Sequence, residues 1–249
     1  MHKLIAVVGP TGSGKTKLAV ELAKKFKGVI ISADSRQVYR GLDIGTNKEG
    51  TPGGWNNQTV MLIDDIPQLL IDVADPGDRF TLNDWLQQAR YWLEPIWRAG
   101  KLPIVVGGTG LYVTALLEGY KPGDGRFAKN NQPVDFESLI LMTDVERQVL
   151  NKRSDERFPR IFDALVTETE KLLEFGVSGE WLDKIGLDYR YAFKRIRGQL
   201  SREEAIEQYQ AASRAYIRRQ LTWWRHHGEP KLIKRSDDAT DLVERWSKD

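Results

Sequence analysis

The sequence contains no cysteine among its 249 residues. Disulfide bonds, thiolate metal sites and cysteine nucleophiles are therefore excluded, and the absence fits a reducing compartment. Long hydrophobic runs are also absent, because no stretch approaches the roughly 20 apolar residues that a membrane-spanning helix needs. The first apolar run, in MHKLIAVVGP, is too short for a signal peptide. We therefore expect a cytoplasmic protein that does not bind membranes.

An excess of charge of one sign is missing too, since the chain carries 37 basic and 35 acidic residues and a net charge of +2. Overall charge therefore does not indicate a nucleic-acid-binding protein. Between Arg190 and Arg225, however, basic residues outnumber acidic ones, and tyrosine and tryptophan lie among them. This segment could follow a phosphate backbone. It could equally be a solvated basic helix face whose aromatic side chains point into the core, and the charge pattern alone does not separate these interpretations.

A phosphate loop is the most informative motif that is present. GPTGSGKT at residues 9–16 follows the apolar run at 4–8 and matches the pattern G-x-x-x-x-G-K-[ST]. Its glycines let the backbone wrap around an anion, and its N–H groups point at that anion from a helix start. Lys15 adds positive charge, and the Thr16 hydroxyl suits Mg²⁺. We therefore predict Mg²⁺ as cofactor, with Thr16 as its protein ligand. The predicted diphosphate site consists of Gly9, Thr11, Gly12, Ser13, Gly14, Lys15 and Thr16.

Hydrophobic periodicity predicts strands that alternate with helices. The expected strands are residues 4–8, 29–33, 102–106 and 139–142, one or both of the runs 61–63 and 69–73, and a short edge strand at 232–233. The expected helices are residues 15–26, 81–99, 109–117, 144–175, 189–196 and 201–227.

This alternation predicts an α/β fold, with a P-loop NTPase-like parallel sheet covered by helices and a helical C-terminal half. Residues 1–249 are expected to form a single domain, with one linker at 121–133. Ligands of such sheets bind at the carboxyl ends of the strands. Asp34 and the pair Gly107-Gly108 both follow predicted strands and should lie at that edge.

An apolar strand that ends in aspartate, which P-loop ATPases use to hold Mg²⁺, is not found. The strand at 102–106 ends in Gly-Gly, and only Asp34, or Asp64 and Asp65, could substitute for the missing carboxylate. This weakens an ATPase interpretation. Asp34 could instead accept a proton, or it could merely cap a helix.

Two arginines lie four residues apart in the predicted helix at 144–175. Arg153 and Arg157 share a helix face, so both could reach the same anion. The alternative is that they form weak surface pairs with Asp155 or Glu156.

Five blocks in this order resemble the tRNA dimethylallyltransferases: GPTGSGKT, ADSRQVYRGLDIGTNK, LLIDVADPGDRFTLNDW, VVGGTGLYVTALLEGY and RRQLTWWR. The resemblance covers about four-fifths of the chain. It implies transfer of a dimethylallyl group from dimethylallyl diphosphate to N6 of the adenosine 3′-adjacent to the anticodon of tRNA. The implied partners are therefore dimethylallyl diphosphate and the anticodon stem-loop, and we expect a monomer.

The resemblance also implies roles for individual residues. Asp34 would be the catalytic base, Thr109 would touch the reacting nucleotide, and Arg157 would help to grip the diphosphate. The implied RNA-binding residues are Asp34, Ser35, Arg36, Gln37, Thr109, Tyr189, Arg190, Arg218, Arg219, Gln220, Trp223 and Arg225. In the block at 184–190 the family usually has Gly-Tyr-Arg where this chain has Asp188-Tyr189-Arg190, which puts a backbone role for that glycine in question.

The larger departure from the family is a deletion. Family members usually carry a helical insertion that grips the anticodon arm, and this chain has only the linker at 121–133 in its place. The adenylate dimethylallyltransferases also lack that insertion and modify free AMP, ADP or ATP, so they remain an alternative, although QLTWWR and GLDIGTNK favour the tRNA enzymes. An ATP-dependent small-molecule kinase and a non-catalytic nucleotide switch are further alternatives. A kinase needs an arginine-bearing lid, and Arg126 is its only indication.

Overall fold

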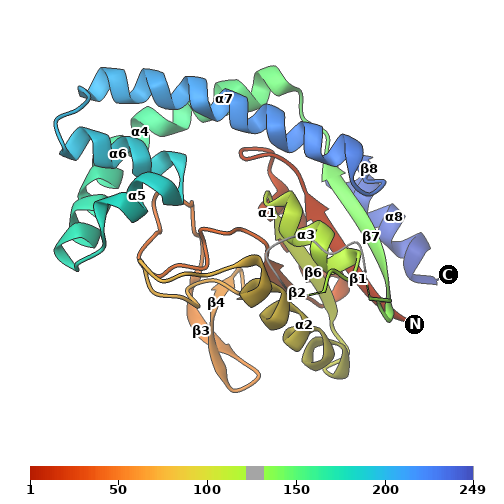
Figure 1. The fold of residues 1–249 in the computed structure, drawn as a ribbon. Coiled ribbons are helices and arrows are strands. Elements are labelled where there is room, and N and C mark those ends of the chain that lie inside the picture. The colour runs from red at the N-terminus through yellow and green to blue at the C-terminus, as the bar shows by residue number, and fades with distance from the viewer. Residues whose placement is uncertain (122–131, 249) are drawn as a thin grey trace.

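A mixed sheet of eight strands forms the centre of the protein, in the order β3-β4-β5-β2-β6-β1-β7-β8 (Figure 1). The structure is a computed structural model that describes residues 1–121 and 132–248, so most of the predicted linker at 121–133, with Arg126, lies outside the described residues. The strands are β1 (His2–Val8), β2 (Gly28–Ser32), β3 (Thr51–Trp55), β4 (Gln58–Ile63), β5 (Ile66–Leu69), β6 (Leu102–Gly107), β7 (Phe136–Thr143) and β8 (Lys231–Ile233).

The middle of the sheet is parallel, as the alternation predicted. Strand β1 pairs with β6 on one side and β7 on the other, β2 pairs with β6 and β5, and β8 adds an edge strand to β7. Successive residues of β1 contact opposite faces: Leu4, Ala6 and Val8 lie in one apolar cluster, and Ile5 and Val7 in the other. A strand that is buried on both faces has no polar alternation, which explains its continuous apolar run.

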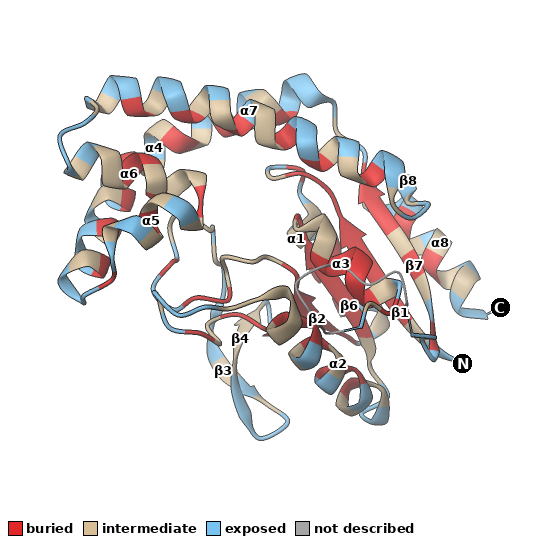
Figure 2. Ribbon diagram, viewed as in Figure 1, coloured by how far each residue is buried: buried red, intermediate tan, exposed pale blue. Residues whose placement is uncertain are grey.

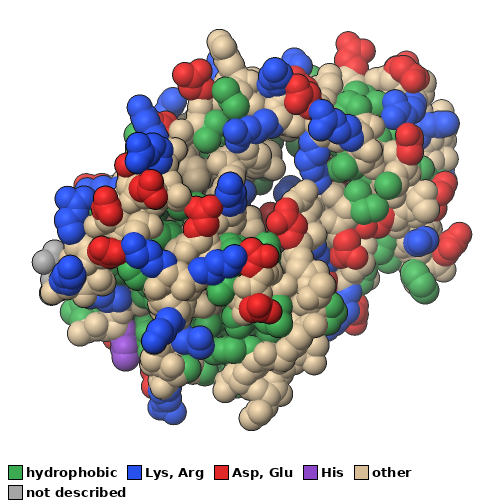
Figure 3. Space-filling model, turned by 180° about the vertical axis from the view of Figure 1, so that it is seen from behind, with side chains coloured by type: hydrophobic (Ala, Val, Ile, Leu, Met, Phe, Trp, Pro, Cys, Tyr) green, Lys and Arg blue, Asp and Glu red, His purple; other side chains and the backbone are tan. Residues whose placement is uncertain are grey.

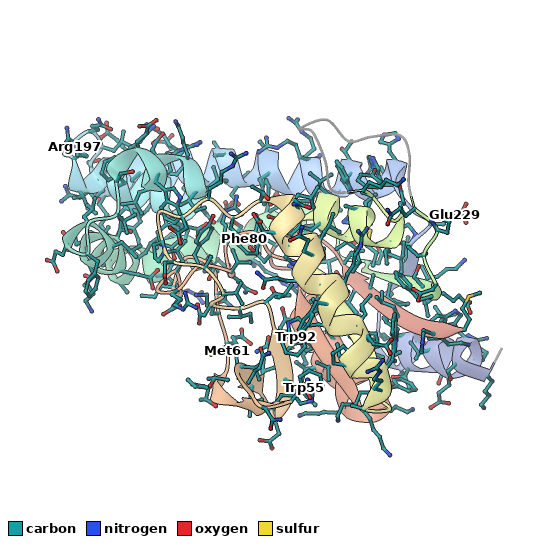
Figure 4. All side chains as sticks on the ribbon, turned by 60° about the horizontal axis from the view of Figure 1, so that its bottom comes forward. Trp55, Met61, Phe80, Trp92, Arg197 and Glu229 are labelled. Atoms are coloured by element: carbon teal, nitrogen blue, oxygen red, sulfur yellow. The ribbon has the colours of Figure 1, made fainter. Side chains whose placement is uncertain are left out.

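The sheet is mixed rather than wholly parallel, because β3, β4 and β5 pair antiparallel at one edge. β3 was not predicted, since its sequence TPGGW contains turn residues, but an edge strand tolerates Pro52 and glycine. The hairpin turn at Asn56 and Asn57 has φ values of 48° and 61°, as two-residue hairpins require. Trp55 anchors the hairpin against Trp92, with ring centroids 5.5 Å apart (Figure 4).

Helices cover both faces of the sheet. α1 (Lys15–Phe26) and α8 (Ser236–Lys248) pack on one face, and α2 (Leu82–Arg98) and α3 (Gly110–Leu117) pack on the other. A capping box begins α2, since Thr81 accepts a hydrogen bond from the Asp84 backbone and Asp84 accepts one from that of Thr81. No helix in the described part of the chain is long and apolar enough to span a membrane.

A helical lobe follows β7 and lies beside the sheet. It consists of α4 (Arg147–Glu174), α5 (Gly179–Ile185), α6 (Leu187–Ile196) and α7 (Arg202–His226). α7 packs against α4 and α6 at its start and reaches α3 near its end, so it spans the lobe and the sheet (Figures 1 and 2). The three predicted helices of this half are confirmed, whereas α5 and α8 were not predicted.

The contact between α4 and α7 depends on a stacked pair of rings. Phe158 is fully buried, and its ring lies 3.4 Å from that of Tyr209. We expect Phe158→Ala to lower the free energy of unfolding by about 3–5 kcal/mol, because it removes a buried ring and leaves a cavity.

Urea denaturation followed by circular dichroism measures this loss. Phe175→Ala is the control, since Phe175 is 84% exposed and its loss should change stability by no more than about 0.5 kcal/mol. Equal stabilities of the two variants would contradict the assigned packing of α4 on α7.

Candidate active site

The phosphate loop connects β1 to α1 at the carboxyl edge of the parallel strands, where it was predicted. It is tied to the neighbouring strand β7, because the Thr143 hydroxyl donates a hydrogen bond of 2.7 Å to Ser13 Oγ. Lys15 Nζ donates to the carbonyl of Pro10 at 3.3 Å. Burial lowers the pKa of Lys15, and the nearby Asp34 carboxylate acts in the opposite direction. The Lys15 ammonium group is therefore held close to the phosphate loop.

A cavity of about 330 Å³ lies in front of the phosphate loop. Seen from behind, the surface is hollowed beneath the α7 layer, where this cavity lies (Figure 3). Its walls come from the phosphate loop, the ends of β2 and β6, the loop at 45–49, α4, α6 and α7. Predicted site residues in its lining are Thr11, Gly12, Gly14, Lys15, Thr16, Asp34, Arg36, Gln37, Arg157 and Gln220.

Asp34 and Thr109 meet at this edge, as expected for residues that follow two neighbouring parallel strands. The Ser35 N–H donates to Thr109 Oγ1 at 3.3 Å, and the Arg36 N–H donates to Asp34 Oδ1 at 2.9 Å. The two strand ends approach closely because Gly107 has no side chain; a Cβ there would lie 2.1 Å from the Ala33 carbonyl oxygen. Asp34 thus orders a turn rather than capping a helix, and its carboxylate faces the cavity.

The two arginines of α4 do not reach the same place. Arg153 Nη1 donates to the Gly12 carbonyl at 2.8 Å, so it supports the phosphate loop from outside. Arg157 lines the cavity: its Nη2 donates to the Ile44 carbonyl at 2.7 Å, and its Nη1 to Asp188 Oδ1 at 3.3 Å. The alternative of surface pairs with Asp155 or Glu156 is therefore wrong; those two acids pair with Arg214, Lys152 and Arg160 instead.

The block at 184–190 contributes a different glycine from the one that the family pattern suggested. Gly186 joins α5 to α6, and a Cβ there would lie 2.4 Å from Arg36 Nε. Arg36 crosses this glycine and donates to the Ile185 carbonyl at 2.8 Å. The close approach thus occurs at Gly186, and Asp188 two residues later is free to line the cavity.

Tyr189 requires a correction. It was predicted to bind RNA, but it is fully buried and its hydroxyl donates to Glu168 Oε1 at 2.6 Å. Its ring packs against Gly45, where a Cβ would lie 2.7 Å from it. Burial raises the pKa of Tyr189, and the Glu168 carboxylate acts in the same direction. Tyr189 therefore supports a wall of the cavity from the core.

The late block on α7 divides between the site and the surface. The Gln220 side chain is buried and bridges two loops: Nε2 donates to the Gly108 carbonyl at 2.9 Å, and Oε1 accepts from the Thr11 N–H at 3.2 Å. Trp223 donates to Thr114 Oγ1 and stacks on His227, with ring centroids 3.9 Å apart.

The remaining arginines of the basic segment lie at or near the surface. Arg190 is partly buried, and its Nε donates to the Asp183 carbonyl at 2.7 Å. Arg218, Arg219 and Arg225 are exposed and form no ion pair within the described residues. Tyr191 and Trp224 are buried while these three arginines face solvent, as expected of a solvated basic helix face. Contact of this segment with a phosphate backbone stays a prediction.

Two charged residues that the sequence did not single out, the buried Lys48 and the partly buried Glu168, hold the loop opposite the phosphate loop. Lys48 is 4% exposed and pairs with Asp72 and with Asp43. Glu168 accepts the N–H groups of Asp43 and Ile44 at 3.1 and 2.8 Å. Lys48 and Asp43 both lie in the block GLDIGTNK, whereas Asp72 and Glu168 come from distant parts of the chain. Removing both acidic partners of Lys48 would leave its buried charge uncompensated.

The cavity suits Mg²⁺ together with a phosphorylated ligand. Thr16 and Asp34 line the same space, and Mg²⁺ typically takes one or two protein oxygens plus phosphate and water oxygens. Within residues 1–121 and 132–248, no group of three or more acidic or histidine side chains could hold a metal alone.

A phosphate loop that faces a carboxylate and arginines across one cavity defines an enzyme of the P-loop class.

Two family models match the chain. One, described as IPP transferase, matches residues 37–129 and 124–227, and the other, described as isopentenyl transferase, matches residues 2–52. The tRNA dimethylallyltransferase of Streptococcus pneumoniae serotype 19F (strain G54) is 34% identical over 273 aligned residues, with 90% of each chain covered. The tRNA dimethylallyltransferase 1 of Geotalea daltonii is 29% identical, with 97% of this chain and 92% of that protein covered. The chain belongs to the tRNA dimethylallyltransferase family.

Solved structures agree with this assignment. The full-length tRNA isopentenylpyrophosphate transferase of Bacillus halodurans has a TM-score of 0.84 at 28% identity, covering 100% of this chain and 96% of that one. The corresponding enzyme of Staphylococcus epidermidis has a TM-score of 0.82 at 25% identity, covering 98% and 99%. The P-loop NTPase-like fold predicted from the sequence is confirmed.

Proposed function

We propose that this protein transfers a dimethylallyl group from dimethylallyl diphosphate to N6 of the adenosine 3′-adjacent to the anticodon of tRNA. The observation that carries the proposal is the cavity that Asp34 shares with Lys15, Thr16 and Arg157. The cavity is thus lined both by a base for the acceptor, Asp34, and by cations for the leaving diphosphate, Lys15 and Arg157. Family membership supplies the reaction class, and the cavity supplies candidate groups for each half of the reaction.

Asp34 acts on the acceptor. The N6 amino group of adenine is a poor nucleophile, because its lone pair is delocalised into the ring. As the new C–N bond forms, the Asp34 carboxylate takes a proton from N6. General-base catalysis of this kind typically raises the reaction rate by about 10²–10⁴-fold. Thr109 lies beside Asp34, joined to it through the Ser35 backbone, and would contact the same nucleotide.

The cations act on the donor. The C–O bond to the diphosphate breaks with cation-like character at the allylic carbon, so stabilising the departing diphosphate is the main task. The N–H groups of the phosphate loop, Lys15 and Arg157 share that charge. Thr16 would hold Mg²⁺, which supplies further positive charge to the diphosphate oxygens. The target base must leave its stack to reach the cavity, as with other enzymes that modify bases.

The acceptor RNA would lie along α7. Arg218, Arg219 and Arg225 are exposed, and arginines that form no ion pair among the described residues suit phosphate contacts. The family match breaks into two segments that meet at residues 124–129, where the sequence departs from the family pattern. With the helical insertion replaced by a short linker, few phosphate contacts remain. Recognition of the tRNA then rests on the anticodon loop that presents the adenine. A monomer of the protein is sufficient for this recognition.

This interface predicts a shallow salt dependence. Each phosphate contact adds about 0.9 to the slope of log K against log salt for a duplex, and about 0.7 for a single strand. We expect a slope equivalent to a few contacts, reduced by roughly one contact in Arg218→Ala or Arg219→Ala. Stem-loop affinity measured at several salt concentrations gives the slope.

Arg98→Ala is the matched control, because Arg98 is exposed on α2 and pairs only with Glu94 of its own helix. Its slope should equal that of the unaltered protein. If all three variants share one slope, α7 is not the RNA-binding surface.

A stem-loop that carries purine in place of the target adenine tests the proposed function. It lacks the N6 amino group and keeps the shape of the base. Mass spectrometry should detect a prenylated product with adenine and none with purine. A phosphorylated product formed with ATP, or stabilisation against heat by ATP but not by dimethylallyl diphosphate, would support a kinase instead.

A further inference from the structure

Asp188 occupies a place in the cavity that the reaction outlined above does not use. It lies in the first turn of α6, and its side chain is 18% exposed. Its Oδ1 accepts from Arg157 Nη1 at 3.3 Å and from the Tyr209 hydroxyl at 3.4 Å. Asp188 therefore pairs with Arg157, one of the cations expected to bind the diphosphate.

The groups that face Asp188 come from several elements. Arg157 approaches from α4 and Arg36 from the loop after β2, while the Tyr209 hydroxyl approaches from α7. Arg36 is held by the Ile185 carbonyl and lies over the Tyr216 ring, 5.6 Å from its centroid. The farther charged side chains in the cavity lining are Lys15, Lys17, Asp34 and Glu49.

Arg157 is held at both ends. Its Nη2 donates to the carbonyls of Ile44 and Gly45, at 2.7 and 3.2 Å, while Nη1 is the group that Asp188 accepts from. The carbonyls fix where the guanidinium lies. Asp188 accepts from the Nη1 end, and both residues line the cavity, so a diphosphate oxygen that approaches Nη1 would meet the Asp188 carboxylate there.

A diphosphate at Arg157 therefore competes with Asp188. Burial raises the pKa of Asp188, although Arg157 and Arg36 act against this rise. When Arg157 turns to a diphosphate, Asp188 loses a favourable partner and gains a negative neighbour. Both changes raise the pKa of the carboxyl further.

We propose that Asp188 is a positioning residue that holds Arg157 at the cavity wall and takes up a proton from solvent when a diphosphate takes over Arg157. This inference rests on the proposed diphosphate site. Binding of the diphosphate is then linked to proton uptake. The Asp188 carboxyl has a higher pKa in the diphosphate complex than in the free protein. Diphosphate affinity therefore rises as the pH falls between these two pKa values, and outside that range it does not depend on Asp188.

Isothermal titration calorimetry with Mg²⁺ and inorganic pyrophosphate tests the proposal. Titrations in buffers of different ionisation enthalpy give the number of protons taken up. Protonation of pyrophosphate itself contributes equally to every variant, so the difference between variants isolates Asp188. We expect the unaltered protein to take up more protons than Asp188→Asn, by up to about one per site. Its affinity should gain up to about tenfold more per unit of falling pH.

Two further variants sharpen the test. Asp188→Glu keeps a carboxyl group and should restore proton uptake, whereas Asn keeps only the shape. Asp163→Asn is the matched control, because Asp163 forms an exposed pair with Arg202 in the same helical lobe. It should take up as many protons as the unaltered protein. Thermal melts of all variants confirm folding.

The outcomes separate this inference from the proposed function. If pyrophosphate binds and proton uptake is the same in the unaltered protein and Asp188→Asn, Asp188 merely supports Arg157 and the inference is wrong while the diphosphate site stands. If pyrophosphate does not bind the unaltered protein at all, the diphosphate site and the inference are both wrong. If Asp188→Asn fails to fold, Asp188→Glu and the unaltered protein are compared instead. The inference is supported if both take up equal numbers of protons and more than pyrophosphate alone accounts for. It is refuted if they take up no more protons than pyrophosphate alone accounts for.

Discussion

Asp34→Asn is expected to lower the rate of prenyl transfer by about 10²–10⁴-fold, the usual cost of losing a general base. Asparagine cannot accept the N6 proton. It can still accept the hydrogen bond that the Arg36 N–H donates to Asp34 Oδ1 at 2.9 Å, so the turn at the edge of the sheet should survive. Diphosphate affinity should therefore change little.

The single-turnover rate with dimethylallyl diphosphate and a stem-loop measures the chemical step, and calorimetry with Mg²⁺ and pyrophosphate measures the affinity. Asp64→Asn is the control, because Asp64 is exposed, pairs with Lys24, and is one of the two other carboxylates that the sequence offered near a strand end. A near-normal rate in Asp34→Asn, or an equal loss in Asp64→Asn, would refute the role of Asp34.

Lys15→Ala is expected to weaken diphosphate binding and to slow the chemical step by about 10²–10³-fold, comparable to removing one donor to a developing negative charge. The ammonium group is held next to the phosphate loop by the Pro10 carbonyl. Because charge develops on the diphosphate as the C–O bond breaks, the lysine should matter more in the transition state than in the ground state.

The same two measurements test this prediction. Lys24→Ala, at the other end of α1 and 52% exposed, should leave both quantities unchanged. If Lys15→Ala weakened binding but left the single-turnover rate intact, Lys15 would hold the substrate without acting on the transition state.

The parts of the fold that local sequence determines could be predicted. β1 and β6 are apolar runs of strand length, and α2 and α7 begin with capping boxes whose side chains act on their own first turn. β3, α5 and α8 could not be predicted, because tertiary contacts decide them. β3 forms from a Pro-Gly-Gly sequence only because β4 pairs with it and Trp92 covers Trp55.

The candidate site divides in the same way. Asp34 and Thr109 were expected together because both follow parallel strands, which end at one edge. The spacing of Arg153 and Arg157 was read correctly as helical, but it does not reveal that one turns to Gly12 and the other to Asp188. Tyr189 was misplaced for a related reason: its Glu168 partner lies on α4, and the sequence does not indicate which side of α6 faces that helix.

A competition between two acceptors tests the central claim most directly. The protein is incubated with dimethylallyl diphosphate, Mg²⁺ and equimolar amounts of AMP and an anticodon stem-loop, and product masses are measured. We expect a prenylated stem-loop and essentially unmodified AMP, with the stem-loop reacting nearly as well as whole tRNA. Efficient prenylation of AMP beside an inert stem-loop would contradict it and would identify a free adenine nucleotide as the acceptor.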